Sequence, residues 1–178
     1  MTSAYSPVPE LNLLWDLQDE AGYEQYADGF GLDDWDDKSG LEAGWSKDPA
    51  FLAALLPFAR ATGGGSFYAL WRVDDRADLA ALPVVVFGDE GGQHVVARNL
   101  RELFQILTFD AEPMIDWDEA TYYRAEDDDT HRDAHDDFVA WLAEHFRLPP
   151  VTDADAVVAA AQAEFGERFK TFTARHLD

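Results

Sequence analysis

The sequence predicts an α+β fold in which an antiparallel β-meander packs against several α-helices. Three short segments rich in aromatic and β-branched residues, 66–73, 83–88 and 93–98, follow one another with turn residues between them. Segments with apolar residues at helical spacing lie on both sides of this group. The chain has 178 residues, which is enough for a single domain with a sizeable core, so we expect one domain over 1–178.

The first helix is predicted to follow Pro9 and to weaken at Gly22. Its apolar residues recur near helical spacing: Leu13, Leu14, Leu17 and Ala21. The next segment, LDDWDDKSGLEAGW (32–45), carries two aspartate pairs around a tryptophan and is punctuated by glycines. This composition predicts a loop or an irregular edge.

Asp48 followed by Pro49 predicts a helix start, because proline suits the first helical position and the aspartate can accept from free amides. Pro57 is expected to kink or end this helix, before the glycines at 63–65 close the segment. The glycine triplet is therefore interpreted as a helix exit. It does not match a phosphate-binding loop, which needs a preceding strand and a following lysine.

The segments after the triplet predict the meander, and DEGG (89–92) supplies the glycines of a tight hairpin turn. Asn99 with Glu102 predicts a capping box at the start of a helix. The apolar residues of that helix recur at i, i+3, i+4 and i+7: Leu100, Leu103, Phe104 and Leu107.

Two more helices are predicted, one near 131–146 and one near 153–170, separated by the prolines of RLPPVTD. Thr152 with Asp155 resembles a second capping box. The buried faces of the two helices are expected to carry Ala134, Phe138, Trp141, Leu142, Val158, Ala161, Phe165 and Phe169. The acidic and aromatic stretch 112–129 supports no assignment.

The chain carries 36 acidic against 13 basic residues, a formal net charge of −23. Such a charge repels nucleic acid and anionic membranes and attracts basic proteins. Adaptation to high salt is an alternative cause of the acidity. The absence of cysteine excludes disulfides and cysteine zinc sites, and no signal peptide or long apolar run occurs, so we expect a cytoplasmic protein.

No residue pattern marks a catalytic site, and we expect no catalytic residue, no cofactor and no bound metal. His131 and His135 are four residues apart on a predicted helix, and could form a metal site with Asp127, Asp128 or Asp133. Solvated helix faces rich in aspartate and histidine arise often by chance. A metal-dependent enzyme therefore remains only an alternative.

Two clusters that mix carboxylates with aromatic rings are candidate surfaces for a protein partner. The first cluster consists of Asp33, Asp34, Trp35, Asp36 and Asp37, and the second of Trp117, Glu126, Asp127, Asp128 and Asp129. Aromatic rings serve as interface anchors, and acids steer a basic partner. The same pattern also describes a solvated acidic coat whose aromatic side chains point into the core.

The middle of the chain, LPFARATGGGSFYALWRV (56–73) and LPVVVFGDEGGQHVVARNLRELFQIL (82–107), resembles the SUKH superfamily. That superfamily includes fungal regulators of cell-wall synthesis and many bacterial immunity proteins. The likeness runs from about Phe51 to Phe109, and the segment 138–146 fits loosely. The positions that match the family pattern are Gly63, Gly64, Gly65, Tyr68, Trp71, Pro83, Gly88 and Leu103.

The resemblance implies a bent antiparallel sheet packed against helices, with its best-supported core at 48–146 and a C-terminal helix at 153–170. The resemblance also implies that the protein has no catalytic activity. In the bacterial branch it implies an immunity protein that binds a cognate toxin, such as a basic nuclease, and occludes its active site. The alternative is a regulatory or scaffold domain, as in the fungal branch, and either protein could be a monomer or a homodimer. The family has no fixed contact motif, so no partner-binding residue is transferred.

Overall fold

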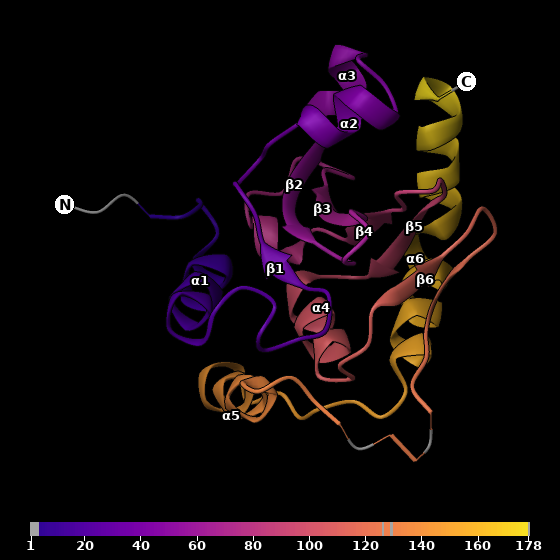
Figure 1. The fold of residues 1–178 in the computed structure, drawn as a ribbon. Helices are drawn as coiled ribbons and strands as arrows, with labels where there is room; N and C mark the ends of the chain where they lie inside the picture. The colour runs from indigo at the N-terminus through magenta and orange to yellow at the C-terminus, as the bar shows by residue number, and fades with distance from the viewer. Residues whose placement is uncertain (1–3, 126, 129, 178) are drawn as a thin grey trace.

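The main sheet is a five-stranded antiparallel meander (Figure 1). The computed structural model describes residues 4–125, 127–128 and 130–177. Within these residues the strands of the sheet are β1 (Gly31–Leu32), β2 (Leu55–Arg60), β3 (Phe67–Trp71), β4 (Val84–Phe87) and β5 (Gln93–Ala97), in that spatial order. Each strand is antiparallel to its neighbour. The predicted α+β fold is confirmed.

The helices precede, follow and interrupt the sheet in the chain. They are α1 (Pro9–Ala21), α2 (Ser39–Gly44), α3 (Pro49–Ala53), α4 (Leu100–Leu107), α5 (His135–Phe146) and α6 (Ala154–His176), with a short 3-10 helix η1 (Leu79–Ala81) before β4. A separate hairpin, β6 (Pro113–Ile115) and β7 (Ala120–Tyr122), follows α4. Among the described residues, every helix is too short or too polar to cross a lipid bilayer.

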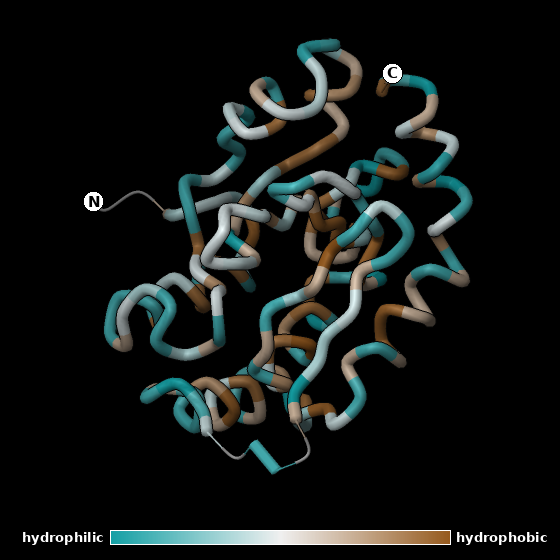
Figure 2. Tube along the Cα trace, turned by 45° about the vertical axis from the view of Figure 1, so that its right-hand side comes forward, coloured by the Kyte–Doolittle hydropathy of each residue, from teal (hydrophilic) through white to brown (hydrophobic). Residues whose placement is uncertain are grey.

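Both faces of the sheet are buried, which follows from the alternation of side chains along a strand. In β4, Val84 and Val86 join the cluster formed with α1, α4 and α5, whereas Val85 and Phe87 join the cluster formed with α2, α3 and α6. The continuous apolar run of this strand therefore has a physical reason. Hydrophobic residues gather along the inner strands and helices, and hydrophilic residues on the outer turns (Figure 2).

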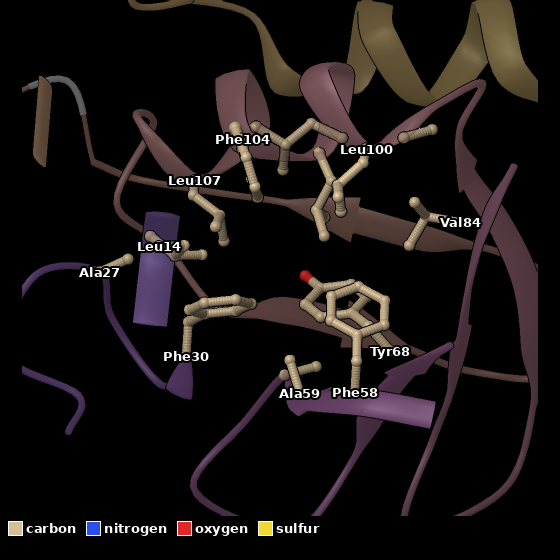
Figure 3. Packing of buried hydrophobic residues seen from close by; sticks show 14 of the residues in the cluster. Leu14, Ala27, Phe30, Phe58, Ala59, Tyr68, Val84, Leu100, Phe104 and Leu107 are labelled. Atoms are coloured by element: carbon tan, nitrogen blue, oxygen red, sulfur yellow. The ribbon is translucent and has the colours of Figure 1, made fainter. Parts of the chain in front are cut away.

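The larger cluster lies between the sheet and α4 (Figure 3). Leu100, Phe104 and Leu107 point from α4 toward Phe58 of β2 and Tyr68 of β3. The cap of α4 is confirmed, because the Asn99 side chain accepts from the amide of Glu102 at 2.9 Å. The predicted buried residues of α5 and α6 are also confirmed: Ala134, Phe138, Trp141, Leu142, Val158, Ala161, Phe165 and Phe169.

The prediction that a helix runs from Asp48 to Pro57 is wrong beyond Ala53. Asp48 caps α3 as expected, accepting from the amide of Ala50 at 3.0 Å. The chain then enters β2, which pairs with both β1 and β3. Pro57 is accommodated beside a β-bulge, where its missing N–H is tolerated. The glycines at 63–65 therefore leave a strand and connect β2 to β3, and they do not form a helix exit.

Four other predictions differ from the structure. The segment 32–45, predicted to be irregular, contains the short helix α2. Helix α5 begins at His135, so that His131 precedes it, and α6 extends six residues past 170 to His176. Asp153 caps α6 in place of the predicted Thr152, accepting from the amide of Ala156 at 3.1 Å. Helix ends depend on local capping geometry, which the apolar spacing does not specify.

Candidate functional site

The β6–β7 hairpin has one face fixed to the core and one face presented outward. Its register pairs Met114 with Thr121 and Ile115 with Ala120. Tyr122 is buried, its hydroxyl forms a 2.5 Å hydrogen bond with that of Tyr68, and its amide donates to Asp155 Oδ1 of α6 at 2.8 Å. Burial raises the pKa of both tyrosines, so the hydroxyls stay neutral and hold the hairpin against the sheet.

The most exposed large hydrophobic side chains among the described residues belong to β6, to the hairpin loop and to the residue after β7. Trp117 is 75% exposed, Tyr123 69% and Met114 59%. All three lie within ten residues of one another in the chain, together with the acidic residues Asp116, Asp118 and Glu119. Met114 and Tyr123 line one cavity and Trp117 lines another. Exposed large apolar side chains amid charges are typical of protein-binding surfaces.

Hydrogen bonds within the loop and from β5 hold the loop that carries Trp117 in place. Asp116 Oδ1 accepts from the amides of Glu119 and Asp118, both at 2.8 Å, and these hydrogen bonds lower the pKa of its carboxyl group. His94 Nε2 of β5 forms a 2.7 Å hydrogen bond with the carbonyl oxygen of Asp116. The aromatic ring is thus presented by an ordered turn, which reduces the entropy lost on binding.

A groove of about 580 Å³ lies beside this loop. Its lining includes Trp45, Asp89, Gln93, Trp117, Lys170 and His176, which come from four separate parts of the chain. The Trp45 ring packs edge-on against Phe67 and Phe87, and its Nε1 donates to Gln93 Oε1 at 3.3 Å. The sequence pattern identified Trp117 but missed this groove, because no local signal connects residues 45, 89 and 170.

The first predicted cluster, Asp33 to Asp37, lies directly after β1, and much of it is engaged within the protein. Asp33 Oδ1 accepts from the Tyr23 hydroxyl at 2.8 Å, Asp36 Oδ1 lies 2.8 Å from Lys38 Nζ, and Asp37 Oδ1 accepts from the amide of Ser39. Trp35 is half-buried against the core and is not a free anchor. The three exposed acids of the cluster, Asp33, Asp34 and Asp37, border a separate cavity of about 260 Å³.

The second predicted cluster is divided in the structure. Asp128 lines a third cavity, of about 630 Å³, with Tyr123. The Asp128 side chain accepts from the hydroxyl and amide of Thr130, which lowers the pKa of its carboxyl group. Asp127 is exposed. Glu126 and Asp129 lie outside the described residues. Trp117 and Asp128 therefore line different cavities, and neither cavity includes the first cluster.

His131 and His135 do come together, but with a partner that the sequence pattern missed. Among the described residues, the acid whose oxygen lies beside them is Asp110, and the proposed Asp127, Asp128 and Asp133 are not part of the group. His131 Nδ1 lies 2.9 Å from Asp110 Oδ2, and the two imidazole rings stack with centroids 4.7 Å apart. Asp110 is buried and has a left-handed backbone conformation, with φ of 59°.

The geometry of this group favours a hydrogen-bonded charge network. A ring nitrogen binds a metal through a lone pair in the ring plane, and the two imidazole planes are nearly parallel, at 5°. The nitrogens of His135 face the carbonyl oxygens of Tyr26 and Thr108 at 2.9 and 3.1 Å. Arg124 Nη1 lies 3.8 Å from Asp110 Oδ2. A metal could bind here only if the rings turned out of their stack.

The positions matched by the family resemblance serve packing and turn geometry. The amide of Gly63 donates to Glu112 Oε1 at 2.8 Å, and the carbonyl of Pro83 accepts from the amide of Trp71 at 3.0 Å. Trp71 packs edge-on against Phe169, and Leu103 is fully buried. A β-carbon at Gly88 would lie 2.4 Å from the carbonyl oxygen of Gly91, so the β4–β5 turn needs glycine there.

Comparison with known proteins gives no match: no family model matches the chain, and no curated protein or solved structure is significantly similar to it.

Proposed function

We propose that this protein is a non-catalytic binding domain that neutralises a bacterial toxin by occluding its active site, with the β6–β7 hairpin as the docking element. The observation that carries the proposal is the exposure of Trp117, 75%, on a turn that hydrogen bonds hold in place. A tryptophan at the centre of an interface is among the strongest energetic anchors. The resemblance to immunity proteins supports the same function.

The charge of the surface indicates the chemistry of the partner. The segment 112–119, EPMIDWDE, contains four acidic residues and no basic residue, and the neighbouring β4–β5 turn adds Asp89 and Glu90. A negative surface on a chain of net charge −23 accelerates encounter with a basic protein. A nuclease toxin fits this description, because its site is built to receive phosphate groups, whose charge carboxylates imitate.

Inhibition by occlusion requires a slow release and no chemical step. Trp117 supplies apolar area at the centre, and Asp116, Asp118 and Glu119 supply a charged rim. Desolvation of the centre lowers the dissociation rate constant, whereas the rim raises the association rate constant. The two effects together give tight binding without a catalytic group.

The test is co-expression with any product of a neighbouring gene that contains a toxin-like domain, scoring growth and co-purification. Wild-type protein is expected to restore growth and to co-purify with the toxin. The Trp117→Ala variant is expected to lose about 30-fold or more in affinity, ~2 kcal/mol, as measured by surface plasmon resonance. Trp15→Ala is the matched control, since Trp15 is 39% exposed on α1 and stacks on Tyr5, away from the hairpin.

Thermal unfolding of both variants confirms that they fold. Equal toxin affinity of Trp117→Ala and the wild type would overturn the docking role of the hairpin. If the protein captures no product of a neighbouring gene, or captures one without restoring growth, the immunity function is wrong. Capture without an effect on growth would instead support the regulatory or scaffold alternative.

A further inference from the structure

The groove between Trp45 and Trp117 has the features of a receptor for one cationic side chain. We propose that it takes an arginine side chain of the basic partner, with Asp89 as the carboxylate that pairs with the guanidinium. This inference rests on the proposed function and names the chemistry that the docking site recognises. It commits to arginine because of the aromatic lining and the acidic surroundings of the groove.

Both tryptophan rings are in place before any partner binds. Trp45 is wedged edge-on against Phe67 and Phe87, with centroids 5.8 and 5.0 Å away. Trp117 lies against Gly91, where an added β-carbon would be 2.5 Å from the indole Cζ2. Rings that are ordered in the free protein cost less entropy when a ligand stacks on them.

Asp89 offers an oriented carboxylate beside these rings. Its Oδ1 accepts from the Ser66 hydroxyl at 2.6 Å, and its own amide donates to the same hydroxyl at 2.9 Å. No described residue donates a hydrogen bond to Oδ2, and Asp89 is exposed. One oxygen therefore fixes the direction of the carboxylate. The other, Oδ2, lies beside Gly64, 2.9 Å from the position of a β-carbon there, and can accept from a guanidinium.

The basic residues of the groove are each matched to an acid within the chain. Lys170 Nζ lies 3.8 Å from Glu167 Oε1 and is 73% exposed, so it can turn toward water. His176 Nδ1 lies 2.6 Å from Asp48 Oδ2, and this hydrogen bond lowers the pKa of Asp48. The acids of the neighbouring turns, Asp116 and Glu90, add to the charge of Asp89. Asp89 is the one acid of the lining and Lys170 the one lysine, so the preference of the groove for a cation comes from these flanking acids.

Arginine fits this lining better than lysine does. A guanidinium is planar, stacks on an indole face and donates in a fixed fork to a carboxylate, whereas an ammonium is compact and strongly hydrated. Stacking on tryptophan is the strongest form of the cation–π interaction. A proline-rich segment is the other occupant that an aromatic groove can accept, and the experiment includes it.

The experiment follows the indole Nε–H resonances of the six tryptophans in 15N-labelled protein by NMR. The probes are acetyl-Gly-Arg-Gly-amide, its lysine and citrulline counterparts, and acetyl-triproline-amide. Trp45→Phe and Trp117→Phe assign the two resonances. We expect the arginine peptide to shift these two with a millimolar dissociation constant, the lysine peptide to bind about fivefold more weakly, and the citrulline peptide not to bind.

Two substitutions in one turn separate a specific contact from general charge. Asp89→Asn is expected to weaken binding of the arginine peptide about fivefold, and Glu90→Gln less than twofold, although both remove one carboxylate. Equal effects of the two variants, equal binding of arginine and citrulline, shifts spread over all indoles, or preference for triproline would each overturn the proposal. If toxin capture still depends on Trp117 in that case, the proposed function stands and only the arginine assignment fails.

Discussion

The indole of Trp117 lies over Gly91 so closely that a β-carbon on that glycine would be 2.5 Å from Cζ2. Gly91 has a φ of +111°, a conformation that other residues rarely adopt. The β4–β5 turn and the loop of the β6–β7 hairpin therefore meet at contacts that require glycine, and Gly92 makes another of them, against the carbonyl oxygen of Asp116. The Gly91 contact places the most exposed aromatic ring of the described residues at the mouth of the groove.

Gly91→Ala is expected to lower the free energy of unfolding by at least ~1 kcal/mol, because alanine is strained at positive φ and its methyl group displaces Trp117. Thermal unfolding and the Trp117 indole resonance measure the two effects. Gly44→Ala is the control, since it lies in α2 and a β-carbon there meets nothing within 4 Å. Equal melting temperatures for Gly91→Ala and Gly44→Ala would contradict this account of the contact.

Asp110→Ala is expected to destabilise the fold by about 3–5 kcal/mol, because it removes the acid of a buried charge network. Asp110 Oδ1 accepts from the amide of Asp28 at 2.8 Å, and Oδ2 faces His131 and Arg124. Urea unfolding measures the change. The exposed Asp133→Ala should alter stability by no more than about 0.5 kcal/mol. A loss at position 110 as small as at position 133 would rule out the network as a stabilising element.

Stability should decline as pH rises above 10. Burial raises the pKa of Tyr26, Tyr68 and Tyr122 above the usual 10.0, so the folded state keeps protons that the unfolded chain releases. Their contribution is fully present below pH 10 and is lost as pH climbs toward the folded-state values. Absorbance at 295 nm and circular dichroism should change together. Full tyrosine ionisation near pH 10 with an intact fold would contradict this prediction.

Gln18→Leu is expected to lower the free energy of unfolding by about 2–4 kcal/mol, because it leaves three buried polar groups without a hydrogen-bond partner. Gln18 Oε1 accepts from the amide of Leu32 and the hydroxyl of Tyr26, both at 2.7 Å, and Nε2 donates to the carbonyl of Leu32 at 3.1 Å. The side chain thus occupies the free edge of β1, where a further strand would otherwise pair. Gln105→Leu, which removes one exposed hydrogen bond, should change urea-unfolding stability by less than 1 kcal/mol.

The sequence by itself determined the elements whose signal is local. The segments 66–73, 83–88 and 93–98 form the strands that their composition predicts, and the helix after Asn99 begins at its cap. The prediction of helix as far as Pro57 is wrong because the strand character of β2 comes from its pairing with β1 and β3, which the local sequence does not specify. The hairpin within 112–129 was missed because its strands are only three residues long.

Only the tertiary structure decided which side chains form the candidate site. Trp35 and Trp117 have the same sequence context, a tryptophan between aspartates, yet Trp35 is half-buried and Trp117 is exposed. Exposure depends on what packs against a ring, and neighbouring sequence does not specify that. In the same way, Asp89 lines a groove with Trp45 and Trp117, and Asp110 lies beside the two histidines. The packing of the sheet and helices brings these residues together from distant parts of the chain. Contacts between residues so far apart in the chain leave no periodic or local pattern in the sequence.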